Sequence, residues 1–229
     1  MAKQKIHRIG YALTKDRKSK AQKIEKLLEE YLGYTVTGKQ ILDVGCGNGE
    51  IAHHFWECGN IVTSVDVERH FEADYGFTFI LVKDENLPFA NDSMDIVISN
   101  HVIEHVGNQA LHMREIYRVL KSGGVCYFAT PNRVFPWEPH TKTLFLHYFP
   151  KRQFWSLLKQ IRKYKEPLSL LTYCEMKKLF RENGFNWIEQ TVKVIKTPKR
   201  YYMKGITLPF VPECTAKVSP TNLFILQKS

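Results

Sequence analysis

The sequence lacks any apolar run of the roughly 18 to 20 residues that a helix needs to cross a bilayer. Its first segment, MAKQKIHRIGYALTKDRKSK, also lacks the apolar core of a secretory signal. We therefore expect a soluble chain that stays in the cytoplasm. The 229 residues are enough for one α/β domain with insertions, and 44% hydrophobic with 24% charged residues is the composition of a globular protein with a buried core.

Paired cysteines are missing as well. The five cysteines are odd in number, widely spaced and without a CxxC pair. Disulfide and zinc frameworks use closely and regularly spaced cysteines, so we interpret these residues as reduced thiols and expect no metal. Internal repeats and low-complexity tracts are also absent, which argues against a solenoid or a fibrous protein.

Acidic residues are too few to balance the basic ones. Lysine and arginine exceed aspartate and glutamate by ten, and much of the excess lies in residues 3–20, 151–165 and 193–204. Such clusters attract phosphates, nucleic acids, anionic membranes or acidic substrates, or they simply form a solvated surface. Without a nucleic-acid-binding module, nucleic acid is a disfavoured partner. We expect a small-molecule substrate, and peripheral contact with an anionic membrane is an alternative that we do not favour.

Short apolar runs alternate with helical segments along the chain. A capping box at Ser19 and Gln22 and the apolar spacing after it predict a helix that ends at Gly33. The segments QILDVG, NIVTSVDV, FTFILV, MDIVIS and GVCYFAT are typical of buried strands. Helix-length connections between them indicate a parallel sheet with right-handed crossovers. A second capping box at Thr172 and Glu175 predicts a later helix, and NWIEQTVKVI and NLFILQK predict two final strands.

A single domain over residues 1–229 fits this order, with a helical segment at residues 1–35 before the first strand. Two intervals are too long for plain connections. They are residues 133–170 and residues 196–220, and the second contains four prolines. Long insertions in a compact α/β domain are commonly lids or binding loops. We expect both insertions to form the substrate side of the site.

The first insertion is rich in aromatic residues, with the segment TPNRVFPWEPHTKTLFLHYFPKRQFW at its start. We interpret it as a substrate pocket and lid, although the same aromatics would equally well build a small satellite core. After Pro150, an apolar stripe with basic neighbours runs from Phe154 to Ile161. This pattern predicts a lid helix in preference to a helix that lies on an anionic surface.

The segment ILDVGCGNGE carries the most information about function. A buried strand from Ile41 to Val44 enters a turn with Gly45, Gly47 and Gly49, and a helix follows. Glycine permits positive φ and lets a ligand approach the backbone closely, and the next helix offers its N-terminal amides. Such a loop at the carboxyl end of a central strand is where doubly wound sheets bind cofactors.

Two acidic residues indicate what kind of cofactor this is. The glycine spacing is GxGxG, unlike the GxGxxG of dinucleotide-binding dehydrogenases, and Asp43 lies two residues before the first glycine. A carboxylate there would repel a pyrophosphate and would suit a cofactor that bears positive charge. Asp66, at the end of the second strand, is the expected ligand of ribose hydroxyls. Dehydrogenases place a similar acid there, so Asp66 alone does not discriminate.

Here the sequence resembles the class I S-adenosylmethionine-dependent methyltransferases, in particular the small-molecule group often called type 11. The matching segments are ILDVGCGNGEIA, SVDVE, LPFANDSMDIVIS, HVIEHV and MREIYRVLKSGGVCYFATPN, together with the last helix and hairpin. They cover about residues 38–132 and 172–228. The resemblance implies a Rossmann-like, doubly wound α/β fold. Its seven-stranded sheet is mostly parallel, with helices on both faces and an antiparallel C-terminal hairpin whose last strand lies between the fifth and sixth.

The resemblance also implies S-adenosylmethionine as cofactor, with S-adenosylhomocysteine as product. By matching positions, the three glycines contact it, Asp43 lies near its cationic amino acid end and Asp66 lies at its ribose. Relatives usually place an aspartate at position 83 to meet the adenine amine. Lys83 stands there in this chain, so Asp84 or a neighbour takes that role. The expected cofactor-binding residues are Asp43, Gly45, Cys46, Gly47, Gly49, Asp66, Val67, Asp84, Glu85 and Asn100.

The five residues HVIEH, His101 to His105, admit two interpretations. On a helix they would match the two zinc ligands and the general base of a hydrolase. The methyltransferase segments on both sides, and the lack of a third marked ligand, favour a stretch that lines the cofactor cleft without metal. A hydroxyl acceptor needs a base, and histidine is the natural one near neutral pH. His105 and His140 are therefore the expected catalytic residues.

The expected reaction is methyl transfer to a small-molecule acceptor, with O-methylation of a saccharide or another polar or anionic metabolite preferred. N- or C-methylation of a natural-product or lipid precursor is an alternative. A non-catalytic protein that only binds the cofactor or a partner is another, because a fold does not guarantee activity. A dehydrogenase is disfavoured by the loop spacing and the C-terminal hairpin, and a zinc hydrolase rests on HVIEH alone.

Overall fold

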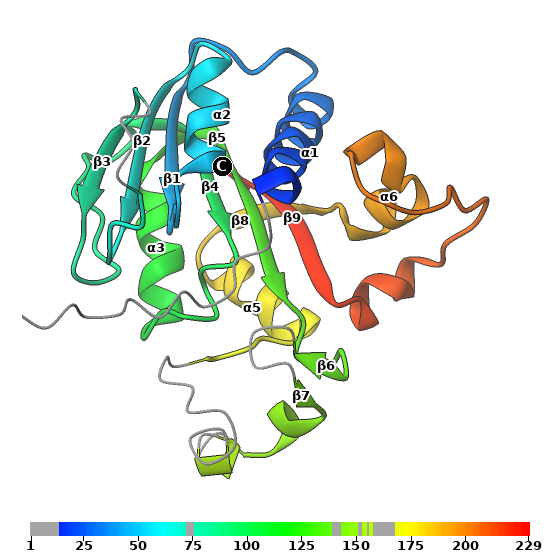
Figure 1. Ribbon diagram of the computed structural model, residues 1–229. Coiled ribbons are helices and arrows are strands. Elements are labelled where there is room, and N and C mark those ends of the chain that lie inside the picture. The colour runs from blue at the N-terminus through cyan, green and yellow to red at the C-terminus, as the bar shows by residue number, and fades with distance from the viewer. Residues whose placement is uncertain (1–13, 72–75, 139–142, 151–152, 155, 158–167) are drawn as a thin grey trace, which may run out of the picture.

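The structure of the protein is a computed structural model that describes residues 14–71, 76–138, 143–150, 153–154, 156–157 and 168–229 (Figure 1). Its centre is a seven-stranded sheet with the strand order β3-β2-β1-β4-β5-β9-β8. The strands are β1 (Gln40–Val44), β2 (Ile61–Asp66), β3 (Thr78–Leu81), β4 (Met94–Asn100), β5 (Leu120–Pro131), β8 (Phe185–Glu189) and β9 (Thr221–Lys228).

Parallel pairing dominates this sheet. Strand β1 pairs in parallel with β2 and β4, β2 with β3, and β4 with β5. Strand β9 runs antiparallel between β5 and β8. The predicted seven-stranded, mostly parallel fold with an antiparallel end is therefore confirmed. The order of strands reverses between β1 and β4, and ligands of doubly wound sheets bind beyond the carboxyl ends of the strands at this point.

Helices cover both faces of the sheet (Figure 1). They are α1 (Thr14–Leu32), α2 (Glu50–Glu57), α3 (Gln109–Val119), α5 (Tyr173–Glu182) and α6 (Thr191–Lys196). Leu27 of α1, Phe55 of α2 and Val194 of α6 lie in one buried apolar cluster. Met113 of α3 and Phe180 of α5 lie in another. Alternate residues of the central strands belong to the one cluster or the other, so each face of the sheet is covered by helices, as is usual for parallel sheets.

The opening helix differs from its prediction at the start and agrees with it at the end. Helix α1 begins at Thr14, so Ser19 lies inside the helix and does not cap it. The predicted apolar face is buried, with Ile24 and Leu28 fully covered. The helix ends as expected at Gly33, which has a φ of 77° and donates its amide to the Glu29 carbonyl at 2.8 Å.

Two strand predictions are wrong in part. FTFILV forms the edge strand β3, where Thr78 and Leu81 are exposed, so it is not a buried strand. NWIEQTVKVI is strand only to Glu189, and TVKVIK forms α6. The carboxylate of Glu189 accepts hydrogen bonds from the amides of Thr191 and Val192. This local cap overrides the β-branched composition that favoured a longer strand.

The two insertions contain only short elements within the described residues. The first holds the small hairpin β6 (Trp137–Glu138) and β7 (Thr143–Leu144) and the turn η1 (Leu146–Tyr148), and the second holds η2 (Pro198–Tyr201) and η3 (Glu213–Val218). The lid helix expected from Phe154 to Ile161 lies largely outside the described residues. Their role as substrate lids stays a prediction. No helix in the described part of the chain is both long enough and apolar enough to span a bilayer.

Candidate functional site

The turn after β1 holds its three glycines in the left-handed region, with φ of 67° at Gly45, 56° at Gly47 and 77° at Gly49. The amides of Gly45 and Cys46 donate to the carbonyl of Val65 on β2, at 2.8 and 3.3 Å. A left-handed backbone is costly for residues with a Cβ, which explains why the sequence uses glycine here. The loop lies across the carboxyl ends of β1 and β2.

Two of these glycines also permit close contacts. A Cβ atom on Gly45 would lie 2.6 Å from Cγ2 of Val102, in the segment after β4. A Cβ atom on Gly49 would lie 2.8 Å from Cζ of Phe77. Real Cβ atoms essentially never approach other atoms so closely. The glycine turn is therefore packed against the HVIEH segment, and the two halves of the predicted site are in contact.

Asp66 ends β2 and faces the glycine turn. Its carboxylate accepts hydrogen bonds from the amide of Gly47 at 2.8 Å and from the amide of Val67 at 2.7 Å. The Asp66 side chain is thereby fixed at the edge of the loop. Oδ1 also accepts from the amide of Glu68 at 3.4 Å, whereas Oδ2 can accept a further hydrogen bond, as from a ribose hydroxyl.

Asp43 is the most unusual charged group of the site. It is only 2% exposed, and its Oδ2 atom has no hydrogen-bond partner among the described residues. Burial, with the negative charge of Asp66 in addition, raises the pKa of Asp43 to about 8, although the amide of Ala52 acts in the opposite direction. A buried carboxyl with one oxygen left without a partner is costly to ionise, and a cation beside it would offset that cost. Asp43 therefore fits the cationic amino acid end of S-adenosylmethionine.

The two acids expected near the adenine both accept hydrogen bonds from other residues of the chain. Asp84 is exposed, and its Oδ1 accepts from the backbone amide and the side-chain amide of Asn86, which lower the pKa of Asp84. Glu85 Oε1 accepts from the amide of Asn108 at 2.9 Å, and this bond ties it to the end of the HVIEH segment. The contact of Asp84 or Glu85 with the adenine amine stays a prediction, as do those of Cys46, Val67 and Asn100.

The HVIEH segment is a turn and not a helix. It follows Asn100, the last residue of β4, and His101 has a φ of 61°, which is uncommon for a residue other than glycine. The amide of His101 donates to the carbonyl of Ala129 on β5 at 2.8 Å. The zinc-hydrolase arrangement, which needs both histidines on one helix face, is absent.

Glu104 is fully buried and joins three parts of the chain. Its carboxylate accepts from Oγ1 of Thr130 at 3.0 Å and lies 3.4 Å from Nδ1 of His101, and its carbonyl accepts from the amide of Ser169 at 2.7 Å. Burial raises the pKa of Glu104, but the hydrogen bond from His101 and the electrostatic influence of His101 and His105 outweigh it and lower the pKa. Glu104 is thus a buried charged group that holds His101 and ties the turn to Thr130 and Ser169.

His105 lies half-buried in this turn, and its amide donates to the carbonyl of Val102 at 2.8 Å. His105 is thus in the same turn as Val102, which contacts Gly45 of the glycine loop. His140, the other expected catalytic residue, lies outside the described residues. The catalytic role of both histidines stays a prediction.

Cys58 and His54 lie at the end of α2 that is away from the glycine turn. Within the described ranges, the His, Cys, Asp and Glu side chains close enough to share an ion are Glu25, His54 and Cys58, on α1 and α2. Glu25 accepts from Cys58 Sγ at 3.2 Å and lies 2.9 Å from His54 Nε2. Burial, and then the hydrogen bond to Glu25, raise the pKa of the Cys58 thiol to about 12. We interpret this group as a hydrogen-bonded link between the two helices.

His112 of α3 lies beneath the site and was not found from the sequence. It is fully buried, and its Nε2 lies 3.2 Å from Oγ of Ser99. Burial lowers the pKa of His112 to about 4, even though Glu85 and Glu104 act in the opposite direction. No sequence motif identifies such a histidine, because it occupies a position on the buried face of the helix where an apolar residue is usually found.

The depressed pKa of His112 makes the stability of the fold depend on pH. The unfolded chain takes up a proton below pH 6.5, whereas the folded chain does so only near pH 4, so stability is lost as pH falls between these values. Replacement of His112 by Gln is expected to remove this dependence, which amounts to at most about 1.4 kcal/mol per pH unit. Urea unfolding of both proteins at pH 7 and pH 5 measures it. An equal loss of unfolding free energy between pH 7 and pH 5 in the two proteins would contradict the assignment of this pH dependence to His112.

The first insertion, in which the acceptor side of the site is expected, begins where β5 ends. His147 is buried, with Nε2 at 3.0 Å from the carbonyl of Arg133. Phe154, Leu168 and Leu170 form a separate small core with Leu146, so the satellite core is mostly aliphatic and is not built by the aromatics from which it was expected. Large aromatics of the same insertion stay exposed, namely Trp137, Phe145, Tyr148 and Phe149. The insertion therefore has both a small core and an aromatic surface.

Comparison with known proteins identifies the kind of domain. A family model described as a methyltransferase domain matches residues 14–190. A probable S-adenosylmethionine-dependent methyltransferase of Mycolicibacterium smegmatis is 32% identical over 114 residues, which are 48% of this chain and 44% of the relative. A malonyl-acyl-carrier-protein O-methyltransferase of Pectobacterium atrosepticum is 31% identical over 108 residues, 41% of this chain and 39% of the relative. The chain thus matches less than half the length of these curated relatives.

Solved structures share the whole fold at low sequence identity. An S-adenosylmethionine-dependent methyltransferase from Mesorhizobium loti matches with a TM-score of 0.60 and 16% identity, over 90% of this chain and 98% of that chain. A 1,6-didemethyltoxoflavin N1-methyltransferase from Burkholderia thailandensis, bound to its substrate and S-adenosylhomocysteine, matches with a TM-score of 0.54 and 15% identity, over 94% and 82% of the two chains. These likenesses support the fold.

Proposed function

The chain belongs to the family of methyltransferase domains, and from this premise we propose that it transfers the methyl group of S-adenosylmethionine to an oxygen atom of a small polar or anionic acceptor. The observation that carries the proposal is Asp43, whose buried Oδ2 has no partner among the described residues, next to a turn of three positive-φ glycines. A cationic amino group would lower the pKa of this carboxyl and form an ion pair with the carboxylate, whereas a phosphate would raise that pKa further and gain no such pair.

The residues that would hold the cofactor lie at the carboxyl ends of β1, β2 and β4. Asp43 would hold the amino group, the turn from Gly45 to Gly49 would lie along the backbone of the amino acid, and Asp66 would accept from the ribose hydroxyls. Bound S-adenosylmethionine supplies a methyl group that its sulfonium already activates. The protein therefore has to position the acceptor, exclude water and remove a proton.

We assign the proton transfer to His105. It stands in the turn whose Val102 touches the glycine loop, next in sequence to the buried Glu104, which fixes this turn through Thr130. An imidazole is the natural general base near neutral pH. Thr130 Oγ1 donates to Glu104 and holds it in place. His140, in the first insertion, is the second candidate.

The acceptor class is argued from chemistry and charge. The chain carries a formal net charge of +10, which favours the approach of anionic molecules. Five of the curated relatives are named O-methyltransferases, whereas structural neighbours include proteins named as N-methyltransferases and as a carbon methyltransferase. A site with a histidine base favours a hydroxyl acceptor, because amines need less help to lose a proton. We propose a saccharide or another hydroxyl-bearing, anionic metabolite.

The proposal is tested with methyl-labelled S-adenosylmethionine and panels of saccharides, nucleotide sugars, hydroxy acids and amines. We expect label in a hydroxyl compound, and at least a roughly 100-fold loss of turnover in the His105→Asn protein. The affinity for S-adenosylhomocysteine is expected to change much less than turnover, because the substitution removes a base and not a cofactor contact.

His53→Asn is the matched control, because His53 lies on α2 and stacks on Trp56 at a ring distance of 5.7 Å. It is expected to retain the turnover of the wild-type protein. Exclusive labelling of amines would refute O-methylation. Equal turnover of the His105→Asn and wild-type proteins would remove His105 from the mechanism.

A further inference from the structure

A run of nine exposed residues follows η2, in the insertion between β8 and β9. It extends from Tyr202 to Phe210 with the sequence YMKGITLPF. Five of its side chains are large and apolar, namely Tyr202, Met203, Ile206, Leu208 and Phe210. Ile206 is 79% exposed and Phe210 is 76% exposed, the two highest values among the large hydrophobic residues described. Apolar side chains gathered on a surface commonly mark a place of interaction.

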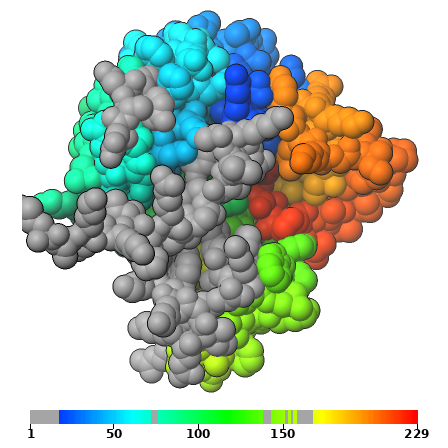
Figure 2. Space-filling view, viewed as in Figure 1, coloured from blue at the N-terminus to red at the C-terminus, as the bar shows by residue number. Residues whose placement is uncertain are grey.

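The segment lies at the rim of the molecule. Figure 1 shows the chain passing from α6 through η2 into a loop that extends beyond the helices at the right-hand edge. In the space-filling view the same segment, coloured orange, forms the protruding right-hand side (Figure 2). The apolar side chains are therefore presented on a projecting part of the protein, where a flat surface can reach them.

Cations surround the apolar side chains. No aspartate or glutamate occurs from Gln190 to Pro212, whereas the same stretch contains five cations, namely Lys193, Lys196, Lys199, Arg200 and Lys204. We call residues 193–210 the basic-apolar segment. The cations and the exposed apolar side chains lie on one continuous stretch of chain, so one bound partner could contact both.

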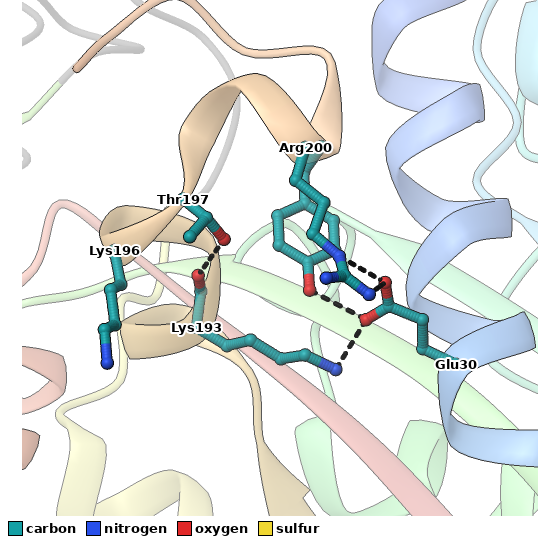
Figure 3. A pocket seen from close by; sticks show the side chains of 6 residues that line it. Glu30, Lys193, Lys196, Thr197 and Arg200 are labelled. Atoms are coloured by element: carbon teal, nitrogen blue, oxygen red, sulfur yellow. Dashed lines mark hydrogen bonds and ion pairs between the residues drawn. The ribbon is translucent and has the colours of Figure 1, made fainter. Parts of the chain in front are cut away.

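One acid from another element offsets part of this charge. Glu30 of α1 lies 2.6 Å from Nζ of Lys193 and 2.7 Å from the guanidinium of Arg200, and it accepts from the hydroxyl of Tyr201 at 2.8 Å (Figure 3). Burial opposes its ionisation, but the hydrogen bonds from Lys193, Tyr201 and Arg200 lower the pKa of Glu30 to about 2. The network clamps η2 onto α1 at neutral pH.

The other three cations of the segment are not compensated. Lys196, Lys199 and Lys204 are exposed and form no ion pair with an acid in the described part of the chain. Lys196 lines the cleft of about 430 Å³ beside Glu30, with its ammonium pointing away from that carboxylate (Figure 3). A net positive surface is thus left next to the exposed apolar side chains.

Backbone hydrogen bonds fix the conformation of the loop after η2. The amide of Met203 donates to the carbonyl of Pro198 at 3.0 Å, and that of Leu208 donates to the carbonyl of Lys196 at 2.9 Å. Gly205 has a φ of 149°, and a Cβ there would lie 2.8 Å from Cγ of Pro198. These contacts hold the loop against η2 with its apolar side chains outward. Little conformational entropy would be lost when a partner binds.

We propose that the basic-apolar segment is a peripheral membrane-binding surface, with the exposed apolar side chains entering the headgroup region and the lysines contacting anionic lipids. Exposed apolar groups with adjacent cations are the combination that binds to an anionic bilayer surface. Four of the five cations are lysines, which are depleted in protein interfaces, so a protein partner fits less well. Only Tyr202 and Phe210 among the five exposed apolar side chains carry a ring on which a base could stack, and the other three are aliphatic, so a nucleic acid fits less well than a bilayer surface.

Sedimentation of the full chain with vesicles tests the proposal, which does not depend on the transfer reaction. We expect binding to vesicles of phosphatidylcholine with phosphatidylglycerol, little binding to phosphatidylcholine alone, and weaker binding at high salt. Reversal of three charges in the Lys196→Glu/Lys199→Glu/Lys204→Glu protein should weaken binding by roughly 100-fold or more. The Ile206→Ser/Phe210→Ser protein should lose the part of the binding that high salt does not remove.

Matched controls lie on exposed sites elsewhere. Leu81→Ser on β3 and Lys178→Glu on α5 change an exposed apolar and an exposed basic side chain, and both are expected to bind vesicles like the wild-type protein. Equal affinity for neutral and anionic vesicles, or unchanged binding by the two segment variants, would overturn the proposal. Binding of a single-stranded oligonucleotide that is lost in the charge-reversed protein, without vesicle binding, would assign the surface to nucleic acid instead.

Discussion

Replacement of Asp43 by Asn is expected to abolish binding of S-adenosylmethionine and, at the same time, to stabilise the cofactor-free protein at alkaline pH. The carboxyl is fully buried without a partner for Oδ2 among the described residues, and its pKa is raised to about 8. Its acid form is therefore favoured in the folded state. An amide has a similar shape, carries no charge and cannot hold a cationic amino group, so affinity should fall by at least roughly 100-fold.

The sign of the stability effect follows from the direction of the shift. Because the folded pKa lies above the ordinary value of 3.8, the folded chain retains a proton that the unfolded chain has lost. Stability is then complete below about pH 4 and is lost as pH rises towards 8. The advantage of the Asp43→Asn protein should grow by at most about 1.4 kcal/mol per pH unit in this range. Urea unfolding at pH 5 and pH 8, without cofactor, measures it.

Asp95→Asn is the matched control, because the same substitution at Asp95 should lower the stability of the fold instead of raising it. Asp95 lies near the amino end of β4, away from the glycine turn, where it accepts from the amide of Gln40 and from Nζ of Lys121, both at 2.8 Å. Burial raises the pKa of Asp95, but these partners outweigh it and lower the pKa. Asp95→Asn should therefore lower stability and leave cofactor affinity unchanged. If Asp43→Asn destabilised the protein at pH 8, the assignment of Asp43 as a buried carboxyl that binds a cation would be wrong.

Replacement of Gly45 by Ala is expected to produce the second large effect, a loss of both stability and cofactor binding. The new methyl group would lie 2.6 Å from Cγ2 of Val102, and the backbone at φ 67° is unfavourable for alanine. Left-handed backbone alone costs an alanine about 1 to 2 kcal/mol, and overpacking adds about 1 to 3 kcal/mol. The glycine turn would have to move away from the HVIEH segment, which would displace its amides from the cofactor.

Gly38→Ala separates the two causes. Gly38 has the same φ of 67°, but no atom lies within 4 Å of the position that a Cβ would take there, so only the backbone cost applies. Combination of Gly45→Ala with Val102→Ala should recover part of the stability, because the smaller side chain leaves room for the methyl group. Equal destabilisation by Gly45→Ala and Gly38→Ala would show that the contact with Val102 does not matter. Thermal unfolding and calorimetric titration with S-adenosylhomocysteine give both readouts.

The parts of the structure that could be predicted from the sequence are those with a local cause. The buried strands around Ile41 and Ile96, the turn with Gly45, and the capping box of Thr172 and Glu175 each depend on neighbouring residues, and the structure contains all of them. The inserted strand β9 followed from the family resemblance, because the pairing of β9 with β5 joins residues far apart in the sequence.

The features that the sequence did not reveal depend on contacts between distant segments. Glu104 is held by Thr130, which follows it by 26 residues, and His112 faces Ser99 across a helix and a strand. Helix α6 was predicted as strand because Val192, Val194 and Ile195 favour strands, and its cap by Glu189 could not be recognised. The exposure of Ile206 and Phe210 was also invisible, because an apolar residue is expected to be buried.

The HVIEH segment shows how the structure changes the interpretation of a motif. Its pattern matches a zinc site, but its five residues form a turn whose glutamate points into the core and binds Thr130. In the structure the segment closes one side of the glycine turn through Val102. His101 and His105 are thus separated in role, the first paired with the buried carboxylate and the second assigned by our proposal to the acceptor.

The central claim is that the carboxyl ends of β1, β2 and β4 form an S-adenosylmethionine site, and calorimetric titration with S-adenosylhomocysteine tests it most directly. We predict one binding site per chain for the wild-type protein, no binding of NAD, and a loss of affinity in an Asp66→Ala protein that still unfolds cooperatively. Absence of heat with S-adenosylhomocysteine, or an affinity unchanged by Asp66→Ala, would contradict the assignment of this site.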